Sequence, residues 1–278
     1  MTARALAIAW VLAFITSAAL IGALVWMDGQ RTYPETPGFT SRPVVLVGSS
    51  LLSSAIPHLM TGDGVLNDGR DHRVLAIGGL TVSQMVTILN QLFGSSAQTV
   101  FIETQPLVYC TANSPKTECD TVSTPTTRIR VKLFLERAAR EVRHQLGKPL
   151  LPRWDGPAAE SSREFRARRG FVERYPFHPL PGEELDSFRG AVNALQKEGK
   201  RIVLITPPRS EWEHKQIGQR QAAEITAHAV QMARELGVEI FQPATHWSNE
   251  YFYDFGHMNS RGRDRFRAAL RDWWAGRR

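Results

Sequence analysis

Short apolar runs alternate with amphipathic segments along most of this chain, and this alternation constrains its fold more than any other feature. The apolar runs are residues 44–47, 74–77, 100–102, 202–205 and 238–241, and turn or polar residues follow most of them. The segments with helical spacing of apolar residues are 81–93, 184–198, 216–236 and 260–274. Strands that are buried on both faces and joined by helices form parallel sheets. The pattern therefore predicts an α/β fold, a three-layer sandwich around a mostly parallel five-stranded sheet.

Two of the predicted helices have clear inner faces. The helix that Thr81 opens should bury one row of side chains, made of Val82, Met85, Val86, Leu89, Leu92 and Phe93. The last helix should bury Phe266, Leu270 and either Trp273 or Trp274. A further helix is expected over residues 127–146.

The N-terminus carries a long uncharged segment. Residues 5–27 contain no charged side chain, and as a helix they would reach about 35 Å, enough to cross a bilayer. We expect residues 1–27 to form an uncleaved signal-anchor helix, single-pass in the inner (cytoplasmic) membrane. Because Arg4 and the terminal amine favour the cytoplasmic side, the remaining chain would lie on the periplasmic, extracytoplasmic side. A cleaved signal peptide is the alternative, and it would also export the domain.

The segments after this helix predict a tethered domain. Residues 28–43 are rich in Pro, Gly and polar residues and predict a linker, and residues 44–278 contain the α/β domain. Residues 147–181 contain several prolines and predict an irregular insertion within it. Cys110 and Cys119, the only cysteines, could form a disulfide in an oxidising compartment, and two free thiols are the alternative.

The net charge of +7 does not by itself identify a partner. Arginines and lysines are interspersed with acids over most of the chain, so a solvated basic surface explains the charge as well as an anion-binding patch does. Binding of nucleic acid conflicts with export of the domain. We therefore expect no nucleic-acid partner.

Residues with possible chemistry follow the predicted strands. In open parallel sheets, ligands bind beyond the carboxyl ends of the strands. The candidates at that edge are Ser50, Gly79, Gln105, Arg209, Asp254 and His257. Each motif also has a structural interpretation, as a turn, a strand end or a loop that leads into a helix. Their occurrence together, each after a predicted strand, favours one catalytic site.

These residue types can perform serine-based acyl transfer. A serine hydroxyl becomes nucleophilic when an imidazole accepts its proton, and a carboxylate fixes the tautomer of that imidazole. Ser50, His257 and Asp254 could fill these roles in that order. Oxyanion donors could be the Ser50 and Gly79 backbone N–H groups and the Gln105 amide, and Arg209 is a candidate substrate-binding residue. This chemistry requires no metal ion or cofactor.

The same motifs resemble the ordered blocks of the SGNH (GDSL-type) hydrolase superfamily. They are Gly48-Ser49-Ser50, Gly79, Gln105 and Asp254-x-x-His257, and the resemblance covers about residues 44–274. It implies a flavodoxin-like sandwich with Ser50 as nucleophile, His257 as base and Asp254 as its partner. The chain departs from the family in two blocks, with Gly-Ser-Ser in place of Gly-Asp-Ser and Glu-Thr-Gln in place of Gly-x-Asn.

The resemblance also implies a function. Membrane-tethered members of the superfamily include O-acetyltransferases and acetylesterases that modify cell-envelope or secreted polysaccharides, some of them beside integral-membrane acyltransferases. We therefore expect a carbohydrate substrate, attachment to the membrane through the N-terminal helix and, as a candidate partner, an integral-membrane acyltransferase. Esterase and transferase stay open, because both pass through the same acyl-serine. A non-catalytic module that binds glycan or docks a membrane partner is the alternative.

The membrane topology can be tested with a reporter fusion. We expect alkaline phosphatase fused to the C-terminus to be active, because the anchor would place the domain outside the cytoplasm. A matched fusion to green fluorescent protein should be dark in the same cells if export uses the general secretory route. If the phosphatase fusion is inactive and the green fluorescent protein fusion is fluorescent, the domain lies in the cytoplasm. Nucleic-acid binding would then become a candidate function again.

Overall fold

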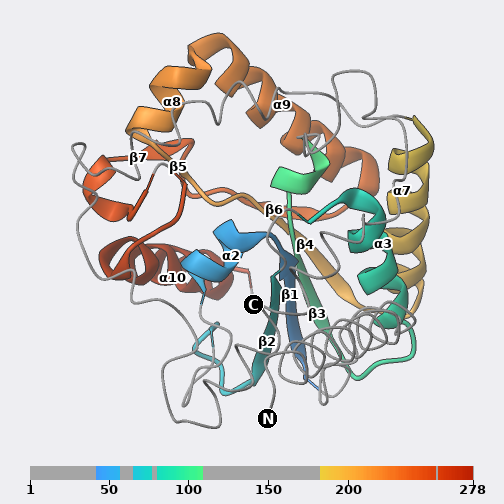
Figure 1. Ribbon diagram of the computed structural model, residues 1–278. Helices are drawn as coiled ribbons and strands as arrows, with labels where there is room; N and C mark the ends of the chain where they lie inside the picture. The colour runs from blue at the N-terminus through green and yellow to red at the C-terminus, as the bar shows by residue number, and fades with distance from the viewer. Residues whose placement is uncertain (1–41, 57–64, 77–79, 109–181, 255, 278) are drawn as a thin grey trace, which may run out of the picture. The chain divides into compact units, whose positions relative to one another are not determined.

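Five parallel strands form the centre of the part of the chain that the computed structural model describes, which is residues 42–56, 65–76, 80–108, 182–254 and 256–277. The strands are β1 (Val44–Gly48), β2 (His72–Ala76), β3 (Thr99–Glu103), β4 (Arg201–Ile205) and β6 (Glu239–Phe241). Their order in the sheet is β2-β1-β3-β4-β6, and every neighbouring pair is parallel. Figure 1 shows this sheet running through the middle of the fold. The predicted five-stranded parallel sheet is confirmed, and its strand order is that of flavodoxin-like sheets.

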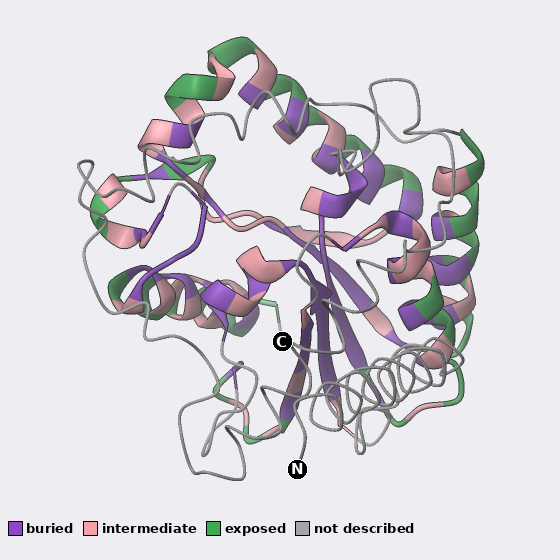
Figure 2. Cartoon of the chain, in the orientation of Figure 1, coloured by how far each residue is buried: buried purple, intermediate pink, exposed green. Residues whose placement is uncertain are grey.

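Helices cover both faces of the sheet (Figure 1). On one face, α3 (Val82–Gln91), α7 (Gly182–Lys197) and α9 (Gln219–Leu236) share a buried cluster with Val45 and Val47 of β1. On the other face, α2 (Ser50–Ala55) and α10 (Ser260–Ala275) share a second cluster with Val44 and Leu46. Successive residues of β1 point to opposite faces and all are buried, which explains the uninterrupted apolar run (Figure 2).

Strand β2 begins two residues earlier than predicted. His72 and Arg73 pair with Val44 and Val45 of β1 and so belong to the strand. Because β2 is the edge strand of the sheet, it can carry polar side chains that an inner strand would exclude. The predicted last residue of this strand, Ile77, lies outside the described residues.

Helix α3 begins where the sequence predicted but buries a different set of residues near its end. Thr81 and Gln84 form a capping box, in which each side chain accepts a hydrogen bond from the backbone N–H of the other. Phe93 was predicted to lie on the inner face, and this was wrong, since the residue is 57% exposed. The helix ends at Gln91, and the chain then turns through Gly94, whose φ is 68°.

The predicted helix over residues 216–236 corresponds mainly to α9, while its first two residues end a separate helix, α8 (Glu211–Ile217), that the sequence did not predict. Gly218 separates them with φ at 84°, a backbone conformation that favours glycine. Two-residue strands, β5 (Arg209–Ser210) and β7 (His246–Trp247), form a small parallel sheet, and η1 (Gln105–Leu107) and η2 (Asn249–Tyr251) are single 3-10 turns. The sequence did not predict these elements, because so few residues carry no readable period.

Helix α10 is fixed at its start by the loop before it. The Asn259 side chain accepts a hydrogen bond from the Gly262 N–H at 3.0 Å. A Cβ atom on Gly262 would lie 2.0 Å from the Tyr251 carbonyl oxygen, so the helix can pack this closely against the loop only with glycine here. Trp274 is buried and Trp273 only partly buried, which settles the open choice for the inner face.

Several predicted features lie outside the described residues. They are the apolar segment 5–27, the linker up to residue 41, the helix over 127–146, the insertion at 147–181 and both cysteines. Within the described part of the chain, no helix combines the length and apolar character needed to span a membrane.

Phe266 of α10 offers a test of the core. Its fully buried ring lies 5.4 Å from the Phe241 ring and 6.3 Å from the Trp247 ring, measured between centroids. We expect Phe266→Ala to lower the free energy of unfolding by about 3–5 kcal/mol, because it leaves a cavity. The control Phe93→Ala, at an exposed position, should change it by less than about 0.5 kcal/mol. Urea unfolding of both variants measures this, and equal losses would contradict the packing described.

Candidate active site

The first candidate residue, Ser50, begins helix α2 directly after strand β1. Ser49 is the N-cap of this helix, and its Oγ accepts a hydrogen bond from the Leu51 N–H at 3.2 Å. The Ser50 hydroxyl is therefore held at the carboxyl end of the central strands. Its own backbone N–H has no hydrogen-bond partner among the described residues, as expected for the first residue of a helix.

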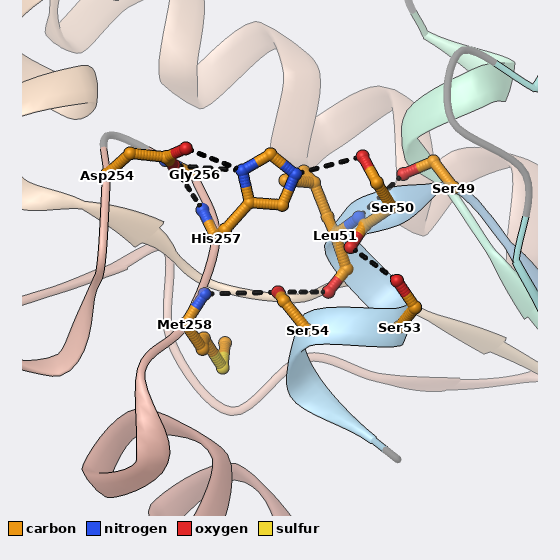
Figure 3. A network of polar contacts seen from close by, with 9 residues as sticks. All are labelled: Ser49, Ser50, Leu51, Ser53, Ser54, Asp254, Gly256, His257 and Met258. Carbon is orange, nitrogen blue, oxygen red and sulfur yellow. Dashed lines mark hydrogen bonds and ion pairs between the residues drawn. The ribbon is translucent and has the colours of Figure 1, made fainter. Parts of the chain in front are cut away.

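His257 lies between Ser50 and Asp254 (Figure 3). The distance from His257 Nε2 to Ser50 Oγ is 2.9 Å, and the distances from Nδ1 to the two Asp254 oxygens are 2.9 and 2.8 Å. Because an ionised carboxylate can only accept hydrogen bonds, Nδ1 carries the proton and its N–H donates a hydrogen bond to Asp254. Nε2, which then carries a lone pair, accepts the hydrogen bond of the Ser50 hydroxyl. The structure thus brings together the three residues that the sequence proposed as a triad.

Asp254 is held in its ionised form. Burial by itself raises the pKa of this carboxyl, but the hydrogen bond and charge of the His257 side chain lower the pKa. The backbone N–H groups of Gly256 and His257 also donate to Oδ1, at 3.0 and 2.8 Å. The net result is a pKa below the ordinary value for aspartate. Asp254 therefore orients the imidazole and can stabilise its positive charge.

A second set of hydrogen bonds fixes the His257 loop against helix α2. The Met258 N–H donates to Ser54 Oγ at 3.0 Å, and the Ser54 hydroxyl donates to the Leu51 carbonyl at 2.7 Å (Figure 3). Met258 also forms an antiparallel bridge with Phe252, which closes the loop that carries Asp254 and His257. These contacts set the position of the imidazole relative to Ser50.

Gln105 lies beside the serine turn, as the sequence predicted for the edge of the sheet. Its Oε1 is 3.2 Å from Ser49 Oγ, so the amide group approaches the N-cap of the nucleophile's helix. Another donor predicted for the oxyanion, the Gly79 backbone N–H, lies outside the described residues. The oxyanion role of Gln105 stays a prediction.

Arg209 is engaged in an ion pair next to the triad. Its guanidinium donates to Glu213 Oε1, and the Glu213 side chain is only 2% exposed. Burial raises the pKa of Glu213, and the charge of Arg209 lowers it in part. The sequence did not predict Glu213, because an acidic residue in a charged helix usually faces solvent. Substrate binding by Arg209 stays a prediction.

Glu103 is the other functional candidate that the sequence missed. This residue ends strand β3, is fully buried, and accepts hydrogen bonds from the Ser49 N–H at 2.6 Å and from Ser49 Oγ at 2.8 Å. Burial raises its pKa to about 7, although the hydrogen bonds from Ser49 lower it. The only sequence signal is an acidic residue that ends an apolar run, and such residues are more often exposed.

The chemistry available here is proton transfer and nucleophilic attack. Ser50 supplies the nucleophile, His257 the base, and the Ser50 N–H and the nearby Gln105 amide supply candidate donors for a developing oxyanion. In the described ranges, no three or more His, Cys, Asp or Glu side chains lie close enough together to ligate a metal ion.

Comparisons with known proteins found solved structures to which this chain is similar at low sequence identity. No family model matches the sequence, and no curated protein matches it. The chain is similar to a GDSL-like lipase from Bacteroides thetaiotaomicron, with 10% identity, a TM-score of 0.42, and coverage of 84% of this chain and 88% of the other. It is also similar to a catalytic mutant of an acetylxylan esterase from Geobacillus stearothermophilus, with 13% identity, a TM-score of 0.34, and coverage of 73% and 76%.

A third solved structure is a psychrotrophic esterase from Pseudoalteromonas, with 12% identity, a TM-score of 0.36, and coverage of 84% of this chain and 99% of the other.

The buried carboxyl of Glu103 predicts a dependence of stability on pH. The folded protein holds the proton of Glu103 up to about pH 7, whereas the ordinary pKa is 4.5. The contribution of this group to stability is therefore fully present below about pH 4.5 and is lost as the pH rises through 7. At about 1.4 kcal/mol for each tenfold change in proton affinity, the loss is about 3 kcal/mol at most.

We expect Glu103→Gln to remove this loss, since an amide can replace the protonated carboxyl at Ser49. Urea unfolding of wild type and variant at pH 5 and pH 8 gives the measurement. The stability of the variant relative to wild type should be higher at pH 8 than at pH 5. An equal difference at both pH values would show that Glu103 is ionised at the same pH in the folded and unfolded states.

Proposed function

We propose that this protein is a membrane-anchored, extracytoplasmic serine acyl-transfer enzyme of the SGNH type. It transfers or hydrolyses acetyl esters on a cell-envelope or secreted polysaccharide. The observation that carries the proposal is the 2.9 Å contact between His257 Nε2 and Ser50 Oγ, with Asp254 on the other ring nitrogen. These two contacts connect a nucleophile, a base and an orienting carboxylate by hydrogen bonds.

In the first half of the reaction, the substrate ester acylates Ser50. Ser50 Oγ attacks the carbonyl carbon while its proton moves to His257 Nε2. Asp254, ionised and buried, stabilises the imidazolium that results. The tetrahedral intermediate then collapses, the bond to the leaving alcohol breaks, and His257 gives its proton to the departing oxygen. The product of this half is the acyl-serine.

In the second half, an acceptor hydroxyl removes the acyl group. Water or a sugar hydroxyl attacks the acyl carbon, and its proton moves to His257. Collapse of the second tetrahedral intermediate releases the acid or the new ester, and Ser50 recovers its proton. Esterase and transferase differ only in which hydroxyl reaches the acyl-serine, so the same triad serves both.

Both tetrahedral intermediates carry a negative oxygen that needs donors. The Ser50 backbone N–H, at the start of α2, is one candidate donor, and the Gln105 amide, whose Oε1 is 3.2 Å from Ser49 Oγ, is another. Removal of one such donor in a serine hydrolase typically reduces kcat by about 100- to 1000-fold. Gln105 replaces the family's usual asparagine with a longer arm that offers the same N–H.

The location and substrate in the proposal rest on the sequence. The uncharged segment 5–27 and Arg4 support an anchor in the inner membrane with the domain outside the cytoplasm. Membrane-tethered relatives in the resembled superfamily support a polysaccharide substrate and an integral-membrane acyltransferase as partner. The acyl donor would then reach Ser50 at the outer surface of the membrane.

The triad can be tested with the full-length protein in detergent. We expect Ser50→Ala and His257→Ala each to reduce the turnover of p-nitrophenyl acetate at least about 1000-fold, because each removes a member of the triad. The matched control Ser187→Ala, at an exposed position of α7, should retain wild-type turnover. A fluorophosphonate probe should add its mass to wild type and to Ser187→Ala, but not to Ser50→Ala.

Acetylated polysaccharides then identify the acceptor chemistry. Release of acetate would indicate an esterase, and transfer of labelled acetyl to a deacetylated glycan would indicate a transferase. Glycan binding that Ser50→Ala leaves intact, with no turnover of any ester and no probe adduct, would overturn the proposal in favour of the non-catalytic module.

A further inference from the structure

Three polar side chains, those of Glu103, Ser49 and Gln105, are connected in a line next to the turn that carries Ser50. The Ser49 hydroxyl lies between the Glu103 carboxyl, with Oγ to Oε1 at 2.8 Å, and the Gln105 amide, with Oγ to Oε1 at 3.2 Å. The second Glu103 oxygen accepts the Ser49 backbone N–H at 2.6 Å. Gln105 therefore presents its carbonyl oxygen to Ser49, which leaves its NH₂ group to face elsewhere.

The number of protons in this line is limited. A serine hydroxyl has one proton, and the two side-chain atoms next to Ser49 Oγ in this line are both oxygen atoms. The Leu51 N–H also donates to Ser49 Oγ, at 3.2 Å, and so cannot take the hydroxyl proton. When Glu103 is ionised, the Ser49 proton goes to the carboxylate, and the Gln105 carbonyl loses its donor. When Glu103 is protonated, its O–H donates to Ser49 Oγ, and the Ser49 proton can then go to Gln105. Only in the neutral form does each of Ser49 Oγ and Gln105 Oε1 receive a proton from the preceding side chain in the line.

We propose that Glu103 is a positioning residue whose neutral carboxyl, acting through the Ser49 hydroxyl, holds the Gln105 amide with its NH₂ toward the acyl oxygen. Ionisation of Glu103 turns the Ser49 O–H toward the carboxylate. The hydrogen bond to Gln105 is then lost, and the amide can rotate. The inference rests on the proposed acyl-transfer function: the protonation state of Glu103 would control one donor of its oxyanion site. Gln105 would contact the substrate, whereas Glu103 and Ser49 would act only through Gln105.

The surroundings of Glu103 favour a switch near neutral pH. The neighbours packed against it are Gly48 of β1, Leu52 of α2 and Ile205 of β4, and none of them carries charge. Among the described residues, His257 is the titratable group whose charge acts on Glu103, and it favours the ionised form. Burial outweighs this and raises the pKa of Glu103 to about 7.

The proposal predicts the shape of the pH profile of kcat. The neutral form of Glu103 is lost above about pH 7, and with it one held oxyanion donor, whose removal typically costs about 100-fold. We expect wild-type kcat to fall at least about tenfold between pH 7 and 8.5. In Glu103→Gln the amide NH₂ replaces the carboxyl O–H toward Ser49 and does not titrate, so this fall should disappear.

A second variant breaks the line without changing its ends. Ser49→Ala removes the hydroxyl that connects Glu103 to Gln105, so kcat at pH 6.5 should fall at least about tenfold with KM unchanged. The fall above pH 7 should be absent in this variant as well. A purely structural role for Glu103 would instead lower the activity of Glu103→Gln at every pH and keep the fall.

Nuclear magnetic resonance of glutamine-labelled protein gives a readout that is independent of turnover. The side-chain NH₂ signals of Gln105, assigned by their absence in Gln105→Ala, should shift in wild type with a midpoint near pH 7. They should not shift over this range in Glu103→Gln or in Ser49→Ala. The use of Ser50→Ala as background removes any contribution from the acyl-enzyme.

The outcomes separate this inference from the proposed function. Turnover that depends on Ser50, together with an unchanged alkaline fall in Glu103→Gln, would overturn the positioning role and leave the function intact. Absence of any turnover dependent on Ser50 would overturn the function. The Gln105 titration would then still decide whether Glu103 controls the amide, and a signal that does not titrate would overturn that control.

Discussion

The parallel register between β1 and β3 is the constraint on which the site depends. Val47 pairs with Ile102, so Gly48 lies next to Glu103 where the two strands end. A Cβ atom on Gly48 would lie only 2.4 Å from Glu103 Oε2, so only glycine leaves room for the carboxyl. The carboxyl can then reach the backbone and hydroxyl of Ser49, which caps the helix of Ser50. A slip of this register would remove the support beneath the nucleophile.

The other half of the site reaches this edge from the far end of the sequence. His257 and Ser50 are 207 residues apart, and their contact requires that α10 and α2 cover the same face of the sheet. Close packing at Gly262 and the hydrogen bond from the Met258 N–H to Ser54 Oγ set the position of the loop that carries His257. The 2.9 Å distance at the nucleophile thus depends on packing of the core as well as on local loop geometry.

Much of the fold could be predicted because burial on both faces of a parallel sheet imposes a readable pattern. The strands showed as apolar runs, and capping residues such as Thr81 marked helix ends. Predictions failed where the burial of a residue or the extent of a helix depends on the point at which the helix ends. Phe93 follows the last turn of α3 and is exposed, and Gly218 divides a segment that looked like one helix. The polar start of β2 was missed because an edge position is not visible in sequence.

The sequence by itself determined the parallel fold and which residues follow the strands, because hydrophobic periodicity and strand ends are local properties. It therefore placed Ser50, Asp254 and His257 at one edge before any distance was known. Only the tertiary structure decided which polar groups at that edge are buried and what they contact. Arg209 is held by Glu213, and Glu103 lies beneath Ser49, because burial and hydrogen bonding depend on elements brought together from distant parts of the chain.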